Sequence, residues 1–295
     1  ESLTYATASE LSSALHTGKI SAVELTEACL NAIATHNSEV NAVITLCEDA
    51  AIAEAKAADL QLHNGSAGPL TGVPLLHKDI FCTRNVPTTC ASKMLRNFIP
   101  PYDATVVSRL RTAGTVMLGK TNMDEFAMGS STETSVFGVT RNPWDLNCVP
   151  GGSSGGAAAA VAAGFAPLST GTDTGGSIRQ PASLCGITGL KPTYGRVSRL
   201  GIIAFASSLD QAGPMTRTVE DAALMLQAMS GIDAGDSTSA DLAVPDFSAG
   251  LNQPVAGLRI GVPKEYFNHN LDEQVAKKIH EALDELVKEG AELVD

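Results

Sequence analysis

The sequence predicts an α/β fold in which a mixed, largely parallel central sheet is covered by helices on both faces. Two observations support this prediction. Helical segments alternate with short apolar runs of strand length along the 295 residues. Hydrophobic residues make up 44% of the chain, which is typical of a globular protein with a large core. We expect a single domain over 1–295, with N-terminal helices in 1–65 and a catalytic α/β core in 66–295 that is incomplete at its C-terminus.

Residues 7–60 are interpreted as a series of helices. Thr7-Ala8-Ser9-Glu10 places a capping residue three positions before a glutamate, the pattern that begins many helices. Leu25, Cys29 and Ile33 share one face of the next helix. Residues 50–62 are rich in alanine and other strong helix formers.

Beyond residue 66, strands and helices alternate. Apolar runs predict strands at 73–76, 115–118, 166–170 and 259–263, and helical periodicity predicts helices at 104–113, 155–163, 219–229 and 272–289. Residues 178–183 can begin another short helix, and residues 291–295 begin a strand-like segment. The polar segment 245–248 is interpreted as a surface connection rather than a domain boundary.

Charge and cysteine usage exclude several classes of protein. The net charge of −12 argues against this chain gripping a nucleic-acid backbone by itself. The six cysteines include no C-x-x-C pair, so no metal site is predicted and reduced thiols of a cytosolic protein are expected. The longest apolar run is shorter than the ~18–20 residues that a membrane span needs, so no membrane association is expected.

Ser177 is the candidate nucleophile. It follows Gly175-Gly176 and precedes a segment that can begin a helix. Glycines let the backbone turn sharply and direct successive N–H groups into one space, which is how an oxyanion hole is built. The alternative is a tight turn with a helix cap, the commoner meaning of an isolated Gly-Gly-Ser.

Lys78 is the candidate base. It lies at the C-terminal edge of a predicted strand, where catalytic groups gather in α/β sheets. A buried lysine whose pKa falls from ~10.4 to near 7 can accept a proton. The histidines lack a supporting motif. The alternative is that Lys78 reaches solvent or pairs with Asp79.

A serine between them can relay a proton. Gly151-Gly152-Ser153-Ser154-Gly155-Gly156 offers Ser153 or Ser154. Such a composition is also typical of a flexible linker. We reject that alternative because a compact Ala/Val helix is predicted directly after it.

Two motifs point to other functions but stand in the wrong context. Residues 114–121 fit the P-loop pattern G-x-x-x-x-G-K-T, yet their inner residues are a predicted strand preceded by a helix, not a phosphate-binding loop. Residues 151–155 fit the nucleophile elbow G-x-S-x-G, but a proline-bracketed loop precedes them instead of a strand.

The stretch from Gly151 through Gly176-Ser177-Ile178-Arg179-Gln180-Pro181-Ala182, together with Lys78, resembles the amidase signature family. The resemblance covers nearly the whole chain and implies the amidase-signature fold. It implies Ser177 as nucleophile, Ser153 in a cis peptide as the bridge, and Lys78 as base. It also implies an oxyanion hole formed by N–H groups of Thr174, Gly175, Gly176 and Ser177.

Residues 124–133 and 190–211 resemble more narrowly the glutaminase subunits of the glutamyl-tRNA(Gln) or aspartyl-tRNA(Asn) amidotransferases. This resemblance implies glutamine as substrate and a heterotrimer with B and C subunits. ATP, magnesium and the main tRNA contacts would belong to the partner, and no cofactor to this chain. Met128, Gly129 and Ser130 are candidate substrate-binding residues. The expected location is the cytoplasm, or an organellar matrix in a eukaryote.

Three other functions stay open at this point. The chain could be a free-standing amidase that acts on another small amide, a scaffold subunit without activity, or a nucleotide-binding protein that uses Lys120. Residues that select glutamine are expected beyond Asp295, because the resembling glutaminase chains are longer.

Overall fold

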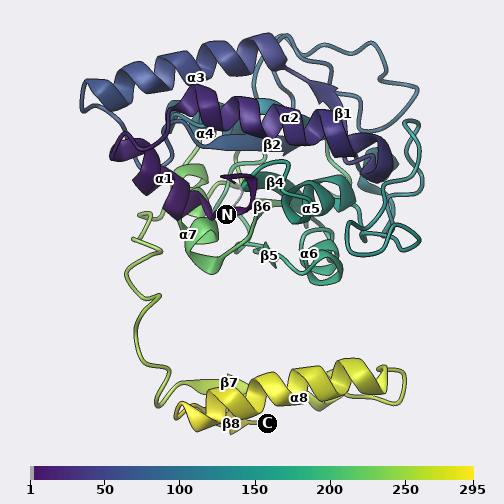
Figure 1. Ribbon diagram of the computed structural model, residues 1–295. Coiled ribbons are helices and arrows are strands. Elements are labelled where there is room, and N and C mark those ends of the chain that lie inside the picture. The colour runs from purple at the N-terminus through teal and green to yellow at the C-terminus, as the bar shows by residue number, and fades with distance from the viewer. Residues whose placement is uncertain (1–2) are drawn as a thin grey trace. The chain divides into compact units, whose positions relative to one another are not determined.

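The computed structural model describes residues 3–295, and its contacts divide them into two compact units, one ending at Ser248 and one beginning at Ala249 (Figure 1). The division lies beside the segment 245–248 that we interpreted as a surface connection. That both units belong to one domain stays a prediction. The elements of the first unit are η1 (Leu3–Tyr5), α1 (Ala8–His16), α2 (Ala22–Val40), β1 (Val43–Leu46), α3 (Glu48–His63), β2 (Pro74–Lys78), α4 (Thr105–Thr112), β3 (Val116–Thr121), η2 (Glu125–Ala127), α5 (Gly155–Ala162), β4 (Leu168–Asp173), α6 (Arg179–Cys185), β5 (Thr188–Gly189), β6 (Gln211–Thr216) and α7 (Val219–Met229).

A six-stranded sheet with the order β1-β3-β2-β4-β6-β5 organises the first unit. The central strands β3, β2 and β4 are parallel, whereas β1 and β6 run antiparallel to their neighbours. Strand β5 is antiparallel to β6 and so runs in the same direction as the central three. The mixed, largely parallel sheet predicted from the sequence is therefore confirmed.

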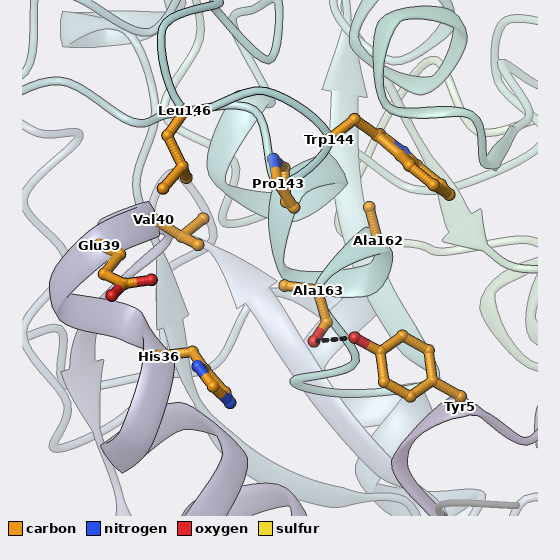
Figure 2. A pocket seen from close by; sticks show the side chains of 9 residues that line it. All are labelled: Tyr5, His36, Glu39, Val40, Pro143, Trp144, Leu146, Ala162 and Ala163. Atoms are coloured by element: carbon orange, nitrogen blue, oxygen red, sulfur yellow. Dashed lines mark hydrogen bonds between the residues drawn. The ribbon is translucent and has the colours of Figure 1, made fainter.

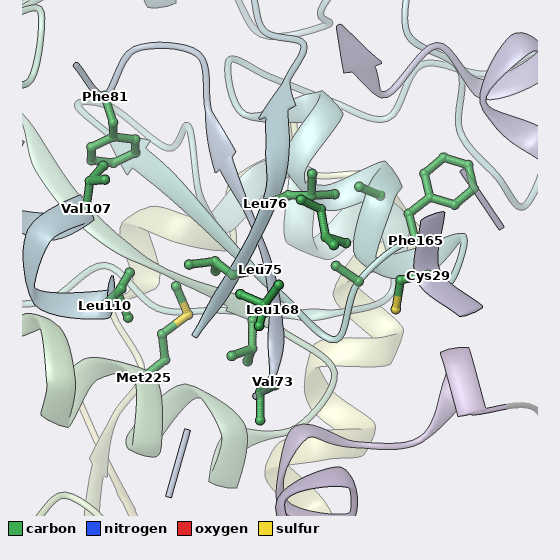
Figure 3. Close-up of a cluster of buried hydrophobic side chains, with 14 of the residues drawn as sticks. Cys29, Val73, Leu75, Leu76, Phe81, Val107, Leu110, Phe165, Leu168 and Met225 are labelled. Atoms are coloured by element: carbon green, nitrogen blue, oxygen red, sulfur yellow. The ribbon is translucent and has the colours of Figure 1, made fainter. Parts of the chain in front are cut away.

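The central strands are buried along their whole length, as parallel strands covered by helices must be. Neighbouring residues of β2 point to opposite sides. Figure 3 shows Leu75 on the side of Leu110 (α4) and Met225 (α7), and Leu76 on the side of Phe165 and Cys29 (α2). Helices thus pack on both faces and hold β2 at the centre of the core.

The predicted helices form with small differences at their ends. Thr7 caps α1, accepting a hydrogen bond from the Glu10 N–H while Glu10 accepts one from the Thr7 N–H. Leu25, Cys29 and Ile33 are buried on one face of α2. The short helix expected near 178–183 is α6.

The prediction of helices alone over residues 7–60 is wrong at one place, the segment between α2 and α3. Asn41 ends α2 in the left-handed conformation, with φ of 54°, and Val43–Leu46 forms the edge strand β1. Three β-branched residues in a row, Val43 to Thr45, favour a strand here. Strand β6 was not predicted because it contains Gly213 and Pro214, residues that normally argue against a strand.

The second unit contains β7 (Arg259–Gly261), η3 (Lys264–Tyr266), α8 (Glu273–Lys288) and β8 (Glu292–Val294). Strands β7 and β8 form a parallel pair. The predicted strand at 259–263, the helix at 272–289 and the strand-like segment at 291–295 correspond to β7, α8 and β8. Within residues 3–295, no helix has the length and apolar character that crossing a membrane requires.

Candidate active site

Lys78 ends the central strand β2 and is completely buried. Its Nζ lies 2.7 Å from Ser153 Oγ, 2.8 Å from Ser154 Oγ and 2.8 Å from Thr172 Oγ1. Burial lowers the pKa of Lys78 from 10.5 to about 7, although nearby carboxylates, that of Asp124 foremost, oppose this. The amine can therefore lose its proton near neutral pH, as a base must.

The hydrogen bonds around Ser154 distinguish the two serines. A serine hydroxyl has one proton to donate. Ser154 Oγ donates to the Thr172 carbonyl (3.1 Å) and accepts from the Thr172 N–H (3.3 Å), so its proton is already engaged. Among the described residues, Ser153 Oγ has a single hydrogen-bond partner, Lys78 Nζ. Ser153, which follows a cis peptide bond from Gly152, is therefore the serine that is free to pass a proton to Nζ.

The Ser177 loop lies beside this pair of serines. The Ser154 N–H donates to the Ser177 carbonyl at 3.2 Å, which joins the two glycine-rich segments directly. Asp173, at the end of β4, accepts hydrogen bonds from the N–H groups of Gly176 (2.7 Å) and Ile178 (3.2 Å) and from the Arg179 guanidinium. Although burial opposes the change, these hydrogen bonds lower the pKa of Asp173. A fixed carboxylate thus shapes the loop that carries Ser177.

A cavity of about 260 Å³ opens at this loop. Its lining combines the Ser177 loop, the segment before Ser153 and the 127–130 loop: Ala127, Gly129, Ser130, Gly152, Gly175, Gly176, Ser177, Gln180 and Phe205. Ser177 is partly exposed there, whereas Lys78 and Ser153 are completely buried, and Ser153 directly follows Gly152 of the lining. The site therefore combines one hydroxyl at the cavity with a buried amine and a second hydroxyl one residue away from the lining.

The predicted substrate-binding and oxyanion-hole residues differ in whether they line the cavity and whether their N–H groups are free. Gly129 and Ser130 line the cavity, whereas Met128 does not and is 56% exposed. The Thr174 hydroxyl donates to Asp210. The Gly176 N–H is bonded to Asp173, but no partner is found among residues 3–295 for the N–H groups of Gly175 and Ser177. Among the lining residues of the Ser177 loop, Gly175 and Ser177 therefore offer free N–H donors.

The P-loop pattern is part of the core. Residues Val116–Thr121 are the buried strand β3, and Lys120 is completely buried. Its Nζ donates to the Phe81 carbonyl at 2.7 Å and lies 3.4 Å from the Asp79 carboxylate. No phosphate can reach this lysine, so the nucleotide-binding alternative at Lys120 is wrong.

Sequence reasoning missed two residues that complete the site. Thr172 supplies the third hydroxyl around Lys78 Nζ. Gln180 accepts a hydrogen bond from the Gly152 N–H. Both stand within the stretch from Gly151 to Ala182 that carries the resemblance, but their contacts with Lys78 and Gly152 join segments far apart in the sequence.

A second pocket of about 330 Å³ lies between η1, α2 and the loop that carries Trp144 (Figure 2). Tyr5 donates a hydrogen bond to the Ala163 carbonyl at its edge. None of the candidate site residues lines it, so it is distinct from the Ser177 cavity.

Comparison with protein families agrees with the resemblance. The model of the amidase family matches residues 24–295. The chain is 64% identical over 289 residues to the A subunit of glutamyl-tRNA(Gln) amidotransferase from Halorhodospira halophila, covering 98% of this chain and 60% of that protein. It is 61% identical over 285 residues to the corresponding protein of Pseudomonas savastanoi pv. phaseolicola, covering 97% and 59%. The chain thus spans about 60% of the length of these relatives.

Solved structures give the same result. The crystal structure of the glutamyl-tRNA(Gln) amidotransferase A subunit from Thermotoga maritima superposes with a TM-score of 0.88 at 44% identity, covering 99% of this chain and 61% of that one. Native peptide amidase from Stenotrophomonas maltophilia superposes with a TM-score of 0.88 at 39% identity, covering 98% and 61%.

Proposed function

The chain belongs to the amidase family, and on this premise we propose that it carries the catalytic centre of the glutamine-hydrolysing subunit of a tRNA-dependent amidotransferase. The observation that carries the proposal is the fully buried Lys78 amine, 2.7 Å from the Oγ of Ser153, whose neighbour Gly152 lines the same cavity as Ser177. The choice of glutamine rests on the similarity to the glutamyl-tRNA(Gln) amidotransferase proteins, which exceeds that to the peptide amidase.

In the proposed reaction, neutral Lys78 takes the Ser153 proton while Ser153 takes the proton of Ser177. Ser177 Oγ attacks the glutamine side-chain amide and forms a tetrahedral oxyanion. The N–H groups of Gly175 and Ser177 hold this oxygen. The Thr174 N–H can join them, and the Gly176 N–H can do so on leaving Asp173.

Collapse of the oxyanion breaks the C–N bond. The leaving nitrogen takes the proton back through Ser153, and ammonia departs. Water then attacks the ester on Ser177 by the same proton path and releases glutamate. Gly129 and Ser130, which line the cavity, are the proposed contacts of the substrate chain, with Met128 at the exposed edge of the same loop.

We place the remaining steps on other chains. Ammonia would pass to a B subunit that activates the tRNA-linked glutamate with ATP and magnesium, and a C subunit would complete the heterotrimer. The acidic charge of −12 supports this division, because it disfavours direct contact with the tRNA backbone. This assembly would act in the cytoplasm, or in an organellar matrix.

The test uses the full-length protein that contains this chain. Ser177→Ala and Lys78→Met should each lower ammonia release from glutamine by on the order of 10⁴-fold or more. Two exposed residues provide matched controls, Ser183→Ala on the helix that follows the Ser177 loop and Lys93→Met. Both controls should keep the wild-type rate. Full activity of Ser177→Ala would remove Ser177 from the mechanism.

A second candidate function is that of a free-standing amidase, and the 39% identity to the peptide amidase supports it. Labelling of Ser177 by a serine-reactive phosphonate, combined with hydrolysis of a peptide amide but not of glutamine, would support it. Absence of labelling would instead indicate an inactive scaffold. Co-purification with two other chains supports the amidotransferase.

A further inference from the structure

Gln180 joins three segments that meet at the Ser177 cavity. It stands on α6, three positions after Ser177. Its Oε1 accepts the Gly152 N–H at 2.9 Å, and its Nε2 donates to the Ser130 carbonyl at 3.0 Å. Gly152 directly precedes Ser153, and Ser130 belongs to a second segment of the cavity lining that packs against Gly152. Although Gln180 is exposed, both ends of its carboxamide are therefore engaged.

The backbone held by Gln180 is closely packed, so that no side chain fits at Gly151 or Gly152. A Cβ atom at Gly151 would lie 2.7 Å from Gln180 Oε1. On the other side, a Cβ atom at Gly152 would lie 2.1 Å from Asp124 Oδ2 and 2.8 Å from the Ser131 nitrogen. Residues 151–152 are thus enclosed between Gln180 and the Asp124 loop. Gln180 is thus hydrogen-bonded to the backbone that leads directly into Ser153.

The carboxamide is chemically suited to this position. It presents an acceptor and a donor at opposite ends, which match an N–H group and a carbonyl. Glutamate would present a second acceptor to the Ser130 carbonyl, and methionine would offer neither group. A misplacement of about 1 Å in a reacting group can cost on the order of 100-fold in rate, so the separation that Gln180 fixes matters for proton transfer through Ser153.

We propose that Gln180 is a positioning residue that uses both ends of its carboxamide to hold the segment preceding Ser153 and the Ser130 loop at a fixed separation. It acts through Ser153 and does not exchange protons with substrate. The inference rests on the proposed serine mechanism and extends it to a residue that only this network of contacts identifies.

A double-mutant cycle in the full-length protein tests the proposal. The rate of phosphonate labelling at Ser177 and the rate of glutamine hydrolysis are measured for Gln180→Met, Ser153→Ala and the double variant. Gln180→Met should lower both rates by about 10- to 100-fold with Ser153 present. It should lower the residual labelling rate by less than about threefold in the Ser153→Ala background, because the group it positions is gone.

Gln180→Glu is the isosteric companion, and its rates should fall at least as far because it cannot donate to Ser130. The control is Gln61→Met, which replaces an exposed glutamine on α3 and should leave the rates unchanged. Melting temperatures show that each variant is folded. Wild-type rates in Gln180→Met or Gln180→Glu, or equal losses in both backgrounds, would overturn the proposal.

The labelling rate separates this inference from the choice of substrate. If Ser177 of the wild-type protein is labelled but glutamine is not hydrolysed, the proposal that glutamine is the substrate is wrong. The role of Gln180 is then still tested, because the double-mutant cycle can be measured by the labelling rate alone. If Ser177 is not labelled at all, both proposals fail together.

Discussion

The effect of Lys78→Met on the free energy of unfolding should depend strongly on pH. Methionine has a similar length but no charge, so it removes the amine and its three hydrogen bonds to hydroxyl groups. Between pH 7 and 10.5 the unfolded chain binds a proton at Lys78 that the folded chain does not, because burial lowers the pKa to about 7. Wild-type stability therefore falls as the pH falls through this range.

The pKa values set the size of the effect. The folded protein does not bind a proton that the unfolded chain binds, which costs about 1.36 kcal/mol for each pH unit below the pKa of the unfolded chain. The free energy of unfolding of the wild type is thereby lowered by about 4 kcal/mol at pH 7 and by about 1 kcal/mol at pH 10. The lost hydrogen bonds cost the variant about 1 kcal/mol each at either pH, about 3 kcal/mol together. Lys78→Met should thus be about 1 kcal/mol more stable than the wild type at pH 7 and about 2 kcal/mol less stable at pH 10.

Urea unfolding at pH 7 and pH 10 measures this difference. Lys93→Met removes an exposed lysine and controls for loss of charge alone, so its effect should be nearly the same at both pH values. The decisive quantity is the change in the effect of Lys78→Met between the two pH values, about 3 kcal/mol. If the two free energies of unfolding keep a constant difference, Lys78 does not carry a lowered pKa and cannot serve as the base.

Three further outcomes are expected. Glutamine hydrolysis should rise with pH through about 7 as Lys78 loses its proton, and a flat rate from pH 5 to 9 would contradict a lysine base. Lys120→Met should lower the free energy of unfolding in urea by about 3–5 kcal/mol because it leaves Asp79 buried without its ion-pair partner, and adding Asp79→Asn should restore much of it. Thr7→Ala should cost about 1 kcal/mol in the same assay, and no loss would show that the α1 cap is dispensable.

The sequence predicted the parts of the fold that rest on local pattern. Capping at Thr7 and the buried face of α2 depend on neighbours three or four residues away, which periodicity records. Strand β6 depends instead on its position between β4 and β5, where Gly213 and Pro214 pair with Gly171 and Thr170. Tertiary pairing overrides local preference there, so no local rule could find it.

The candidate site was likewise predicted only in part from the sequence. The motif residues Lys78, Ser153 and Ser177 were identified from residue type and setting. The choice of Ser153 over Ser154 on physical grounds needs the hydrogen bonds between Ser154, just before α5, and Thr172 on β4. Gln180 shows the same limit, because its two partners come from separate loops.

The two buried lysines show why burial alone does not make a base. Lys78 and Lys120 lie on adjacent parallel strands, one residue out of register, and both are completely buried. Burial lowers the pKa of each, but for Lys120 the nearby Asp79 carboxylate opposes the change directly. Within residues 3–295, the Lys78 amine is hydrogen-bonded only to hydroxyl groups, which stabilise an ammonium less than a carboxylate does and can themselves donate a proton. Because Asp79 pairs with Lys120 rather than with its sequence neighbour, a carboxylate in contact opposes loss of the proton from Lys120, whereas Lys78 has only hydroxyl partners in the described part of the chain and is left able to accept a proton.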